Sequence, residues 1–336
     1  MVNSQGVISA PARRRIFFCF ACACALAVAI ILSLRFGTLK LSTAELWALC
    51  RHPDGVAARI ILHIRLPRIL LGAMVGGALA VSGAILQSVM RNVLAAPGII
   101  GVSAGGGLAG VMVMMAFPEW SVLQLPAAFA GALLTAALVY ALAWKRGISP
   151  TRLILAGVAV SAMMGAVTSA ILLFNAEKAG GILEFTIGSL SARSWPQIAR
   201  VRWYMAGGFA VALMLGRKLN ALALGDEIAA SLGIAVERTR FAALAAAALL
   251  AAASVSVAGL LGFVGLIAPH IVRMAIGADN RFLIPGSALF GAFLVVTCDT
   301  AGRLVMSPSE LPVGIIMALM GPPFFLWLLR RHRYGA

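Results

Sequence analysis

Apolar runs long enough to cross a bilayer follow one another along this chain, with only short polar segments between them. Hydrophobic residues make up 62% of the 336 residues and charged residues 11%, whereas a globular domain usually carries about 25% charged residues. A spanning helix needs about 20 residues, which leaves room for about ten spans once loops are allowed for. The sequence therefore predicts an all-α, polytopic membrane protein and excludes a single soluble core.

Ten spans place both termini on one side of the membrane. Basic residues are more frequent on the side that then faces the cytoplasm, as the positive-inside rule requires. We therefore expect one transmembrane domain over 1–336, with cytoplasmic termini and a cytoplasmic tail at 1–15. A short interfacial helix and loop is expected at Asn175–Gln197. The expected spans are Ile16–Leu34, Ile69–Met90, Ile99–Phe117, Val122–Trp144, Arg152–Phe174, Trp203–Leu219, Phe241–Val257, Leu261–Ile276, Leu283–Arg303 and Pro312–Leu329.

Patterns that would indicate a cofactor or metal site occur in the wrong surroundings. Gly105–Gly110 matches G-x-G-x-x-G, but the dinucleotide motif requires a preceding strand, and this stretch lies in an expected membrane helix. Cys19, Cys22 and Cys24 have no histidine or acidic residue nearby, so no zinc site is expected. The net charge of +16 is assigned to topology rather than to nucleic acid, since no soluble basic domain exists. No cofactor, metal or catalytic residue is predicted.

The segment 221–240 is the longest run that resembles ordinary soluble protein. Asp226 is expected to cap a short helix that starts at Glu227, because its carboxylate can accept the free N–H groups of a first turn. Gly233 is expected to end that helix, since glycine reaches the left-handed conformation without penalty. Val236–Arg240 then begins the next helix. Such a segment between two spans is either a solvated loop or a docking surface.

Ionisable groups inside the expected spans are scarce. Asp299 lies four residues before Arg303 on one helical face, which predicts a local ion pair. His270 follows Pro269 at an expected helix break, and it is interpreted as structural because a lone histidine makes a poor relay. A proton-coupled carrier would show a chain of such groups, and none is evident. No nucleophile with a neighbouring base is evident either.

Several arginines are expected at the outer face of the membrane. Arg59, Arg65, Arg68 and Arg303 form a positive set there. Their charge suits an acidic soluble partner, and it equally suits contact with phospholipid headgroups. The residues alone leave both interpretations open.

Six motifs, in order, resemble those of the FecCD/BtuC-type permeases. These are the membrane subunits of bacterial ABC importers for ferric siderophores, haem and cobalamin. The resemblance covers about Arg65 to Arg331, and it departs from the usual pattern at Val93, Ala96 and Phe185. The motifs are RLPRILLGAMVGGALAVSGAILQ, RNVLAAPGIIGVSAG, SPTRLILAGVAVSA, LALGDEIAASLGI, GFVGLIAPHIVR and ELPVGIIMALMGPPFFLWLLRR.

The resemblance implies a type II ABC importer (BtuC-like) permease fold in the bacterial cytoplasmic membrane. It also implies a second permease subunit, which is either another copy or a paralogue. Two separate ATPase subunits and a soluble binding protein, periplasmic or lipid-anchored, complete the assembly. It assigns ATPase coupling to Gly225, Asp226, Glu227, Ser231, Leu232, Gly233 and Arg238. It assigns binding-protein docking to Arg65, Arg68 and Arg303.

The functional expectation is an ATP-driven importer permease for an iron chelate, in the first place a ferric siderophore. Haem and cobalamin are alternatives within the same machinery. An ion-coupled secondary transporter is a hypothesis from another class, and it would take up substrate without any ATPase subunit. No G-x-x-x-x-G-K-[ST] motif occurs in the chain, so ATP hydrolysis is expected on separate subunits.

Overall fold

The computed structural model describes residues 11–37, 55–145, 149–175 and 179–331. This part of the chain is helical and contains no β-strand. The principal helices are α1 (Ala12–Arg35), α4 (Leu66–Val89), α5 (Val102–Ala116), α6 (Gln124–Ala143), α7 (Pro150–Phe174), α9 (Trp195–Leu224), α11 (Val236–Ala258), α12 (Val264–Ile276), α13 (Asn280–Val305) and α14 (Val313–Arg331). The short helices are α3 (Val56–Ile60), α8 (Ala179–Ile187) and α10 (Asp226–Ser231), together with a π-helical turn at Ile61–Arg65 and 3-10 turns at Pro97–Ile100 and Pro118–Leu123.

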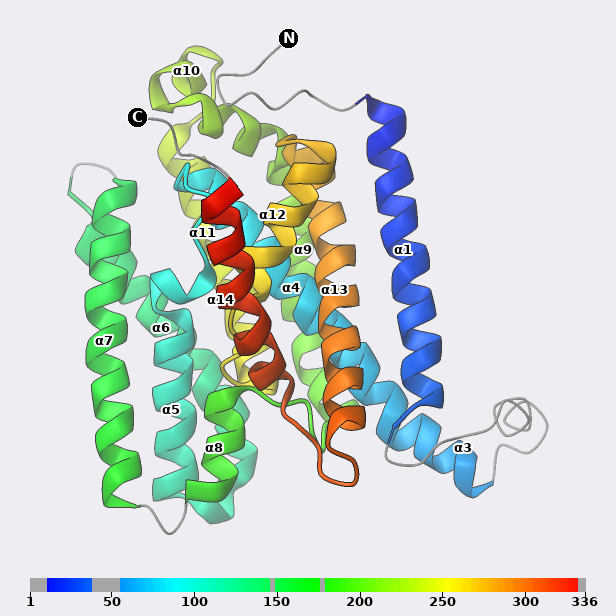
Figure 1. Ribbon diagram of the computed structural model, residues 1–336. Helices are drawn as coiled ribbons and strands as arrows, with labels where there is room; N and C mark the ends of the chain where they lie inside the picture. The colour runs from blue at the N-terminus through cyan, green and yellow to red at the C-terminus, as the bar shows by residue number, and fades with distance from the viewer. Residues whose placement is uncertain (1–10, 38–54, 146–148, 176–178, 332–336) are drawn as a thin grey trace.

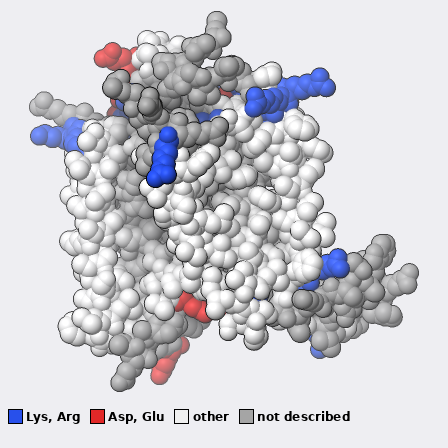
Figure 2. Space-filling model, in the orientation of Figure 1, with Lys and Arg blue, Asp and Glu red and all other residues white. Residues whose placement is uncertain are grey.

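The expected ten spans are recovered as helices. Seven helices are long and apolar enough to cross a membrane, and Val102–Ala116, Val264–Ile276 and Val313–Trp327 are shorter apolar helices. Figure 1 shows these helices packed side by side, with α10, the start of α1 and the end of α14 at one end of the bundle. We call this the α10 end, and we call the opposite end, where α3 and α8 lie, the α8 end. Figure 2 shows a broad uncharged band between two ends that carry the charged residues.

Helix α4 forms the centre of the bundle and packs against α9, α11, α12 and α13. Its glycines allow this enclosure: a Cβ atom at Gly76 would overlap the carbonyl oxygen of Gly291, and one at Gly83 would overlap that of Gly265. Close backbone approach at small residues is the usual basis of helix packing in membranes. The glycines of α4 are therefore explained by helix contacts.

The non-helical segments that follow α8 and α11 contact each other and the start of α14. Helix α12 has 13 residues and is about 20 Å long, which is shorter than the ~30 Å bilayer core. The turn before α12 is held by Leu260 N–H, which donates to Phe185 at 3.1 Å, and by Ala258 C=O, which accepts from Ser189 at 2.9 Å. Gly314 N–H of α14 donates to Gly188 at 3.0 Å. These internal partners satisfy peptide groups for which the bilayer core has none.

Two helices differ from expectation. Helix α9 begins at Trp195 rather than at Trp203, because Ser194 and Gln197 form a capping box, a signal that sequence reasoning missed. Helix α12 runs straight through Pro269, so the expected break there is wrong. His270 is buried and packs edge-on against Phe324, with ring centroids 6.1 Å apart, in agreement with a structural role.

Helix α1 lies at the edge of the bundle and contacts mainly α13. It begins at Ala12, so Arg13–Arg15 belong to its first turn; residues 1–10 lie outside the described part. Arg15 donates to Asp279 at 2.8 Å. Burial disfavours the Asp279 carboxylate, but hydrogen bonds from Arg281 and Asn220 outweigh burial and hold the pKa of Asp279 well below its usual range.

Candidate coupling element and buried arginine cluster

The segment between α9 and α11 forms a compact turn of helix at the α10 end (Figure 1). Gly225 (φ +119) ends α9, and Gly233 (φ +77) ends α10. Gly233 N–H donates to Ala230 at 2.9 Å and Ile234 N–H donates to Ala229 at 3.1 Å, which is the hydrogen-bond pattern of a Schellman cap. The prediction that Gly233 ends this helix is confirmed.

Arg240 anchors this segment to the bundle, and sequence reasoning missed it. Its side chain is 2% exposed and donates to Asp226 at 2.7 Å and to Glu237 at 2.8 Å. Asp226 is the first residue of α10 and makes no capping hydrogen bond, so its predicted capping role is wrong. Its carboxylate is held by Arg240 instead, and Arg91 approaches it at 3.6 Å. The Glu237–Arg240 spacing was the available signal, since residues three apart share a helical face.

The outer side of α10 combines exposed apolar and polar groups. Ile228 and Leu232 are 48% and 63% exposed. Glu227, Ser231 and Arg238 are exposed around them, whereas Gly225 and Asp226 are partly buried. An exposed apolar patch with a charged rim is characteristic of protein interaction sites. Six of the seven predicted coupling residues lie between α9 and α11, and the seventh, Arg238, lies in the first turn of α11. We call residues 225–240 the α10 segment, which Arg240 attaches to the bundle.

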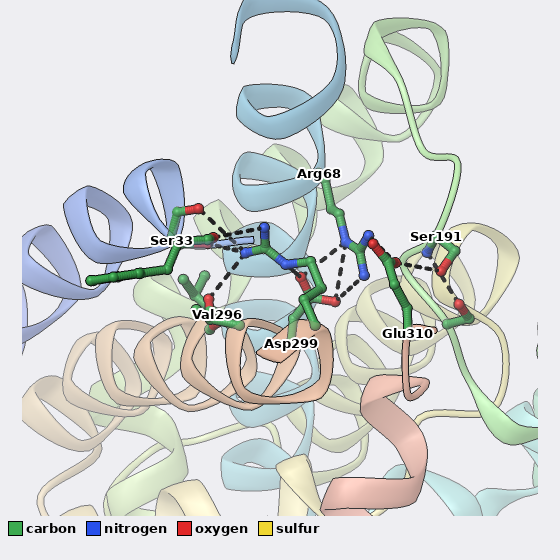
Figure 3. Close-up of polar contacts among 10 residues, drawn as sticks. Ser33, Arg68, Ser191, Val296, Asp299 and Glu310 are labelled. Carbon is green, nitrogen blue, oxygen red and sulfur yellow. Dashed lines mark hydrogen bonds and ion pairs between the residues drawn. The ribbon is translucent and has the colours of Figure 1, made fainter. Parts of the chain in front are cut away.

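A second polar group lies buried toward the α8 end, where Arg68 reaches across to α13 (Figure 3). The guanidinium of Arg68 donates to both carboxylate oxygens of Asp299 at 2.9–3.2 Å and to Glu310 at 2.6 Å. Arg303 Nε lies 3.3 Å from Asp299 on the same helix, so the predicted local ion pair is confirmed. One carboxylate thus contacts two arginines from different helices.

Arg65 and Arg303 also contact the end of α1, and Arg303 donates to the hydroxyl of Thr300 at 3.2 Å. Arg65 donates to the carbonyl of Leu34, and Arg303 donates to the hydroxyl of Ser33 and to the carbonyl of Phe36. The last carbonyls of a helix lack partners within the helix, and positive charge is favourable there. We call Arg65, Arg68, Asp299, Arg303 and Glu310 the arginine cluster.

The predicted docking arginines are brought together, but they are not an exposed rim. Arg65, Arg68 and Arg303 are 5%, 8% and 3% exposed. Apart from Asp299 and Thr300, which are close to Arg303 in the sequence, the acceptors of these arginines lie 30 to 270 positions away in the chain, so sequence spacing could not identify them. Arg59 lies on α3, also toward the α8 end.

The described residues contain no group of three or more His, Cys, Asp or Glu side chains that could hold a metal ion. Cys19, Cys22, Cys24 and Cys298 are free thiols. Cys50 lies outside the described residues.

Comparison with known proteins identifies the fold. A sequence profile of the FecCD transport family matches residues 25–331. The chain belongs to the FecCD transport family. The arginine cluster and the α10 segment both lie within the matched range.

Relatives in the FecCD family carry permease names. The chain is 45% identical over 279 residues to a cobalamin import system permease protein, BtuC of Halobacterium salinarum, covering 82% of this chain and 75% of that protein. It is 39% identical to the hemin transport system permease protein HmuU of Yersinia pestis, covering 90% and 91%. Other relatives are named as Fe(3+)-citrate and iron(3+)-hydroxamate import permeases.

A solved structure supports the same fold. It is an inward-facing conformation of a transporter assigned to the metal-chelate type of ABC transporter, with a TM-score of 0.85 and 30% identity, covering 94% of this chain and 99% of that one. The fold of this FecCD member is therefore that of a BtuC-like permease.

Proposed function

We propose that this chain is the permease subunit of an ABC importer that moves a ferric siderophore into the cytoplasm. A soluble binding protein delivers the chelate, and separate subunits hydrolyse ATP. The α10 segment carries this proposal: it exposes an apolar patch at one end of the bundle while Arg240 fixes its base. We assign Gly225, Asp226, Glu227, Ser231, Leu232, Gly233 and Arg238 to ATPase coupling. The α10 end, where α1 begins and α14 ends, then faces the cytoplasm, and we assign both termini to that side of the membrane.

The test of coupling is Gly233→Val. A β-branched residue strongly resists positive φ, and no heavy atom lies within 4 Å of the added Cβ position, so the change strains the turn without a clash. The variant should assemble with its ATPase subunits but lose substrate-stimulated ATP hydrolysis and uptake in proteoliposomes. Gly233→Asn is the matched control, because asparagine tolerates the left-handed conformation. Normal transport by Gly233→Val would show that this segment does not couple ATP hydrolysis to transport.

Docking of the binding protein is assigned to Arg65, Arg68 and Arg303 at the α8 end. Their gathering at the end opposite α10 supports this assignment. Each guanidinium has acceptors within the chain, so carboxylates of a partner would have to exchange with Asp299, Glu310 or the end of α1. Affinity for the binding protein should fall as salt rises, because the Debye length shrinks from about 10 Å at 0.1 M to about 3 Å at 1 M. A salt-independent affinity would contradict docking through these charges.

The second permease subunit is proposed to cover α7. Only 11% of the most apolar 18-residue stretch of α7 is buried within this chain, and Leu155, Met163 and Phe174 are among its exposed residues. Another copy of this chain or a paralogue would fit there.

The substrate is assigned from chemistry shared with relatives. Their names include iron chelates, haem and cobalamin, and we place the ferric chelate first. Proteoliposomes containing the complete importer should take up a ferric siderophore with ATP and the cognate binding protein. Uptake of haem or cobalamin alone would redirect the assignment while leaving the coupling test intact. Uptake without ATPase subunits would instead indicate a secondary transporter.

A further inference from the structure

An apolar groove opens on the side of the bundle between α6 and α9. Both helices pack against α11, but they make little contact with each other. The space between them has a volume of about 670 Å³, which lies within the ~300–1,000 Å³ typical of ligand pockets. Its lining includes Leu133 and Tyr140 of α6, Gly207 and Val211 of α9, and alanines of α11. None of these residues belongs to the α10 segment or to the arginine cluster.

Small side chains create this groove. Its α11 floor is rich in alanine, including Ala242, Ala245 and Ala248. On the α9 wall a Cβ atom at Gly207 would have nothing within 4 Å, whereas one at Gly208 would meet Leu250 at 2.7 Å. Small residues normally let a neighbouring helix approach closely, but no described helix fills this space. The groove therefore faces whatever surrounds the protein in the membrane.

Aromatic pairs bound the groove at both ends. Phe129 of α6 stacks on Tyr204 of α9 at 4.8 Å toward the α8 end. Toward the α10 end, Tyr140 packs against Phe241 at 5.4 Å and against Trp144 at 5.7 Å. From Phe129 to Tyr140 the distance along α6 is about 16 Å at ~1.5 Å per residue. This is close to half of the ~30 Å bilayer core, the depth reached by the acyl chain of one leaflet.

Three cations lie near the α10 end of the groove, where the neighbouring carboxylate, Glu237, is paired with Arg240 at 2.8 Å. Lys145 directly follows Trp144. Lys218 is two helical turns beyond Val211 on the same face of α9, and Arg238 is one turn before Phe241 and Ala242 on α11. All three are exposed, and none forms an ion pair within the described part of the chain. Tyrosine and tryptophan mark the headgroup level of a bilayer, so these charges lie at the height of lipid phosphates.

We propose that this groove binds one acyl chain of an anionic glycerophospholipid from the leaflet at the α10 end, with Lys145, Lys218 and Arg238 around its phosphate. A helix from a second copy would fill the apolar space but leave these three charges without partners. An anionic lipid satisfies both the groove and its charged mouth. This inference does not depend on the substrate, and Arg238 is the one residue that it shares with the proposed coupling role.

The test measures lipid retained by the full-length chain purified in detergent. The chain is mixed with dioleoylphosphatidylglycerol or dioleoylphosphatidylcholine, and bound lipid is counted by native mass spectrometry. Phosphatidylglycerol should be retained at one molecule per chain and preferred over phosphatidylcholine. Lys145→Gln and Lys218→Gln should each weaken retention about fivefold, since a cation near the membrane surface contributes ~1 kcal/mol toward anionic lipid. Arg238 is left unchanged because it lies in the proposed coupling segment.

Gly207→Leu should abolish this retention by filling the groove. Gly165→Leu on α7 is the matched control, because its added Cβ also meets nothing within 4 Å and it lies outside the groove. If Gly207→Leu lowers expression, Val211→Trp serves the same purpose. Equal retention of both lipids, or retention unaffected by these substitutions, would overturn the proposal. So would a cross-link between chains through cysteines placed at Val211, which would identify the occupant as a second copy.

Discussion

Asp299 is the residue on which the arginine cluster depends. It accepts from Arg68 and lies beside Arg303, so Asp299→Asn would leave two buried guanidiniums short of negative charge. Removing one partner of a buried pair costs about 3–5 kcal/mol. We expect a clear drop in the thermal unfolding midpoint of the detergent-purified chain, because asparagine preserves size but not charge.

Glu310→Gln provides the matched control for that substitution. Glu310 also contacts Arg68, but its side chain is 28% exposed whereas that of Asp299 is 4% exposed, so less desolvation accompanies its pairing. A small loss is therefore expected. Equal losses in the two variants would mean that Asp299 is not the centre of the cluster.

Individual residues also mark the limit of sequence reasoning. Gly233 and the Asp299–Arg303 pair were predictable because turn chemistry and helical spacing are local. The partners of Arg68 and the contact of Arg303 with Ser33 were not, since Glu310 and Ser33 meet these arginines only after distant segments pack. Asp226 shows the same limit, because a capping role and a tertiary ion pair require the same side chain.

At the scale of elements, the packing of α4 rests on glycines that admit no side chain. Gly83→Ala should strongly destabilise the chain, because the added methyl group overlaps the carbonyl oxygen of Gly265. Overpacking typically costs about 1–3 kcal/mol. Thermal unfolding and the yield of folded protein in detergent would measure the loss.

Gly165→Ala tests whether that loss reflects packing rather than the residue type. The added methyl group at Gly165 meets nothing within 4 Å, and alanine favours a helix over glycine by about 1 kcal/mol. Its stability should be unchanged or slightly higher. A comparable loss in both variants would rule out the close approach of α4 and α12 as the cause.

Element positions were more predictable than element ends. Apolar runs located all ten expected helices, because the bilayer requires such runs. The start of α9 and the continuity of α12 through Pro269 depend on a capping box and on local packing, which hydropathy does not register. The depth of the short helix α12 likewise follows from its contacts with α4 and α13.

At the scale of the whole molecule, the two ends of the bundle should face different compartments. In a chain whose own cysteines are replaced, Ser231→Cys marks the α10 end and Ser309→Cys marks the α8 end, and both positions are exposed. A membrane-impermeant maleimide should label Ser309→Cys in intact spheroplasts and Ser231→Cys only after the membrane is opened. The reverse pattern would invert the proposed topology.

The attachment of α1 has a consequence for the order of biogenesis. Arg15 near its start and Ser33 near its end are held by residues 264 and 270 positions later in the chain. During synthesis this first helix therefore enters the lipid long before either anchor has left the ribosome. Until then, only the hydrophobicity of its own side chains keeps α1 inserted in the membrane. Its mean hydropathy of 2.7 is the highest among the seven long candidate spans of the described residues. This value suits a helix that must stay in the membrane before its partner helices have been synthesised.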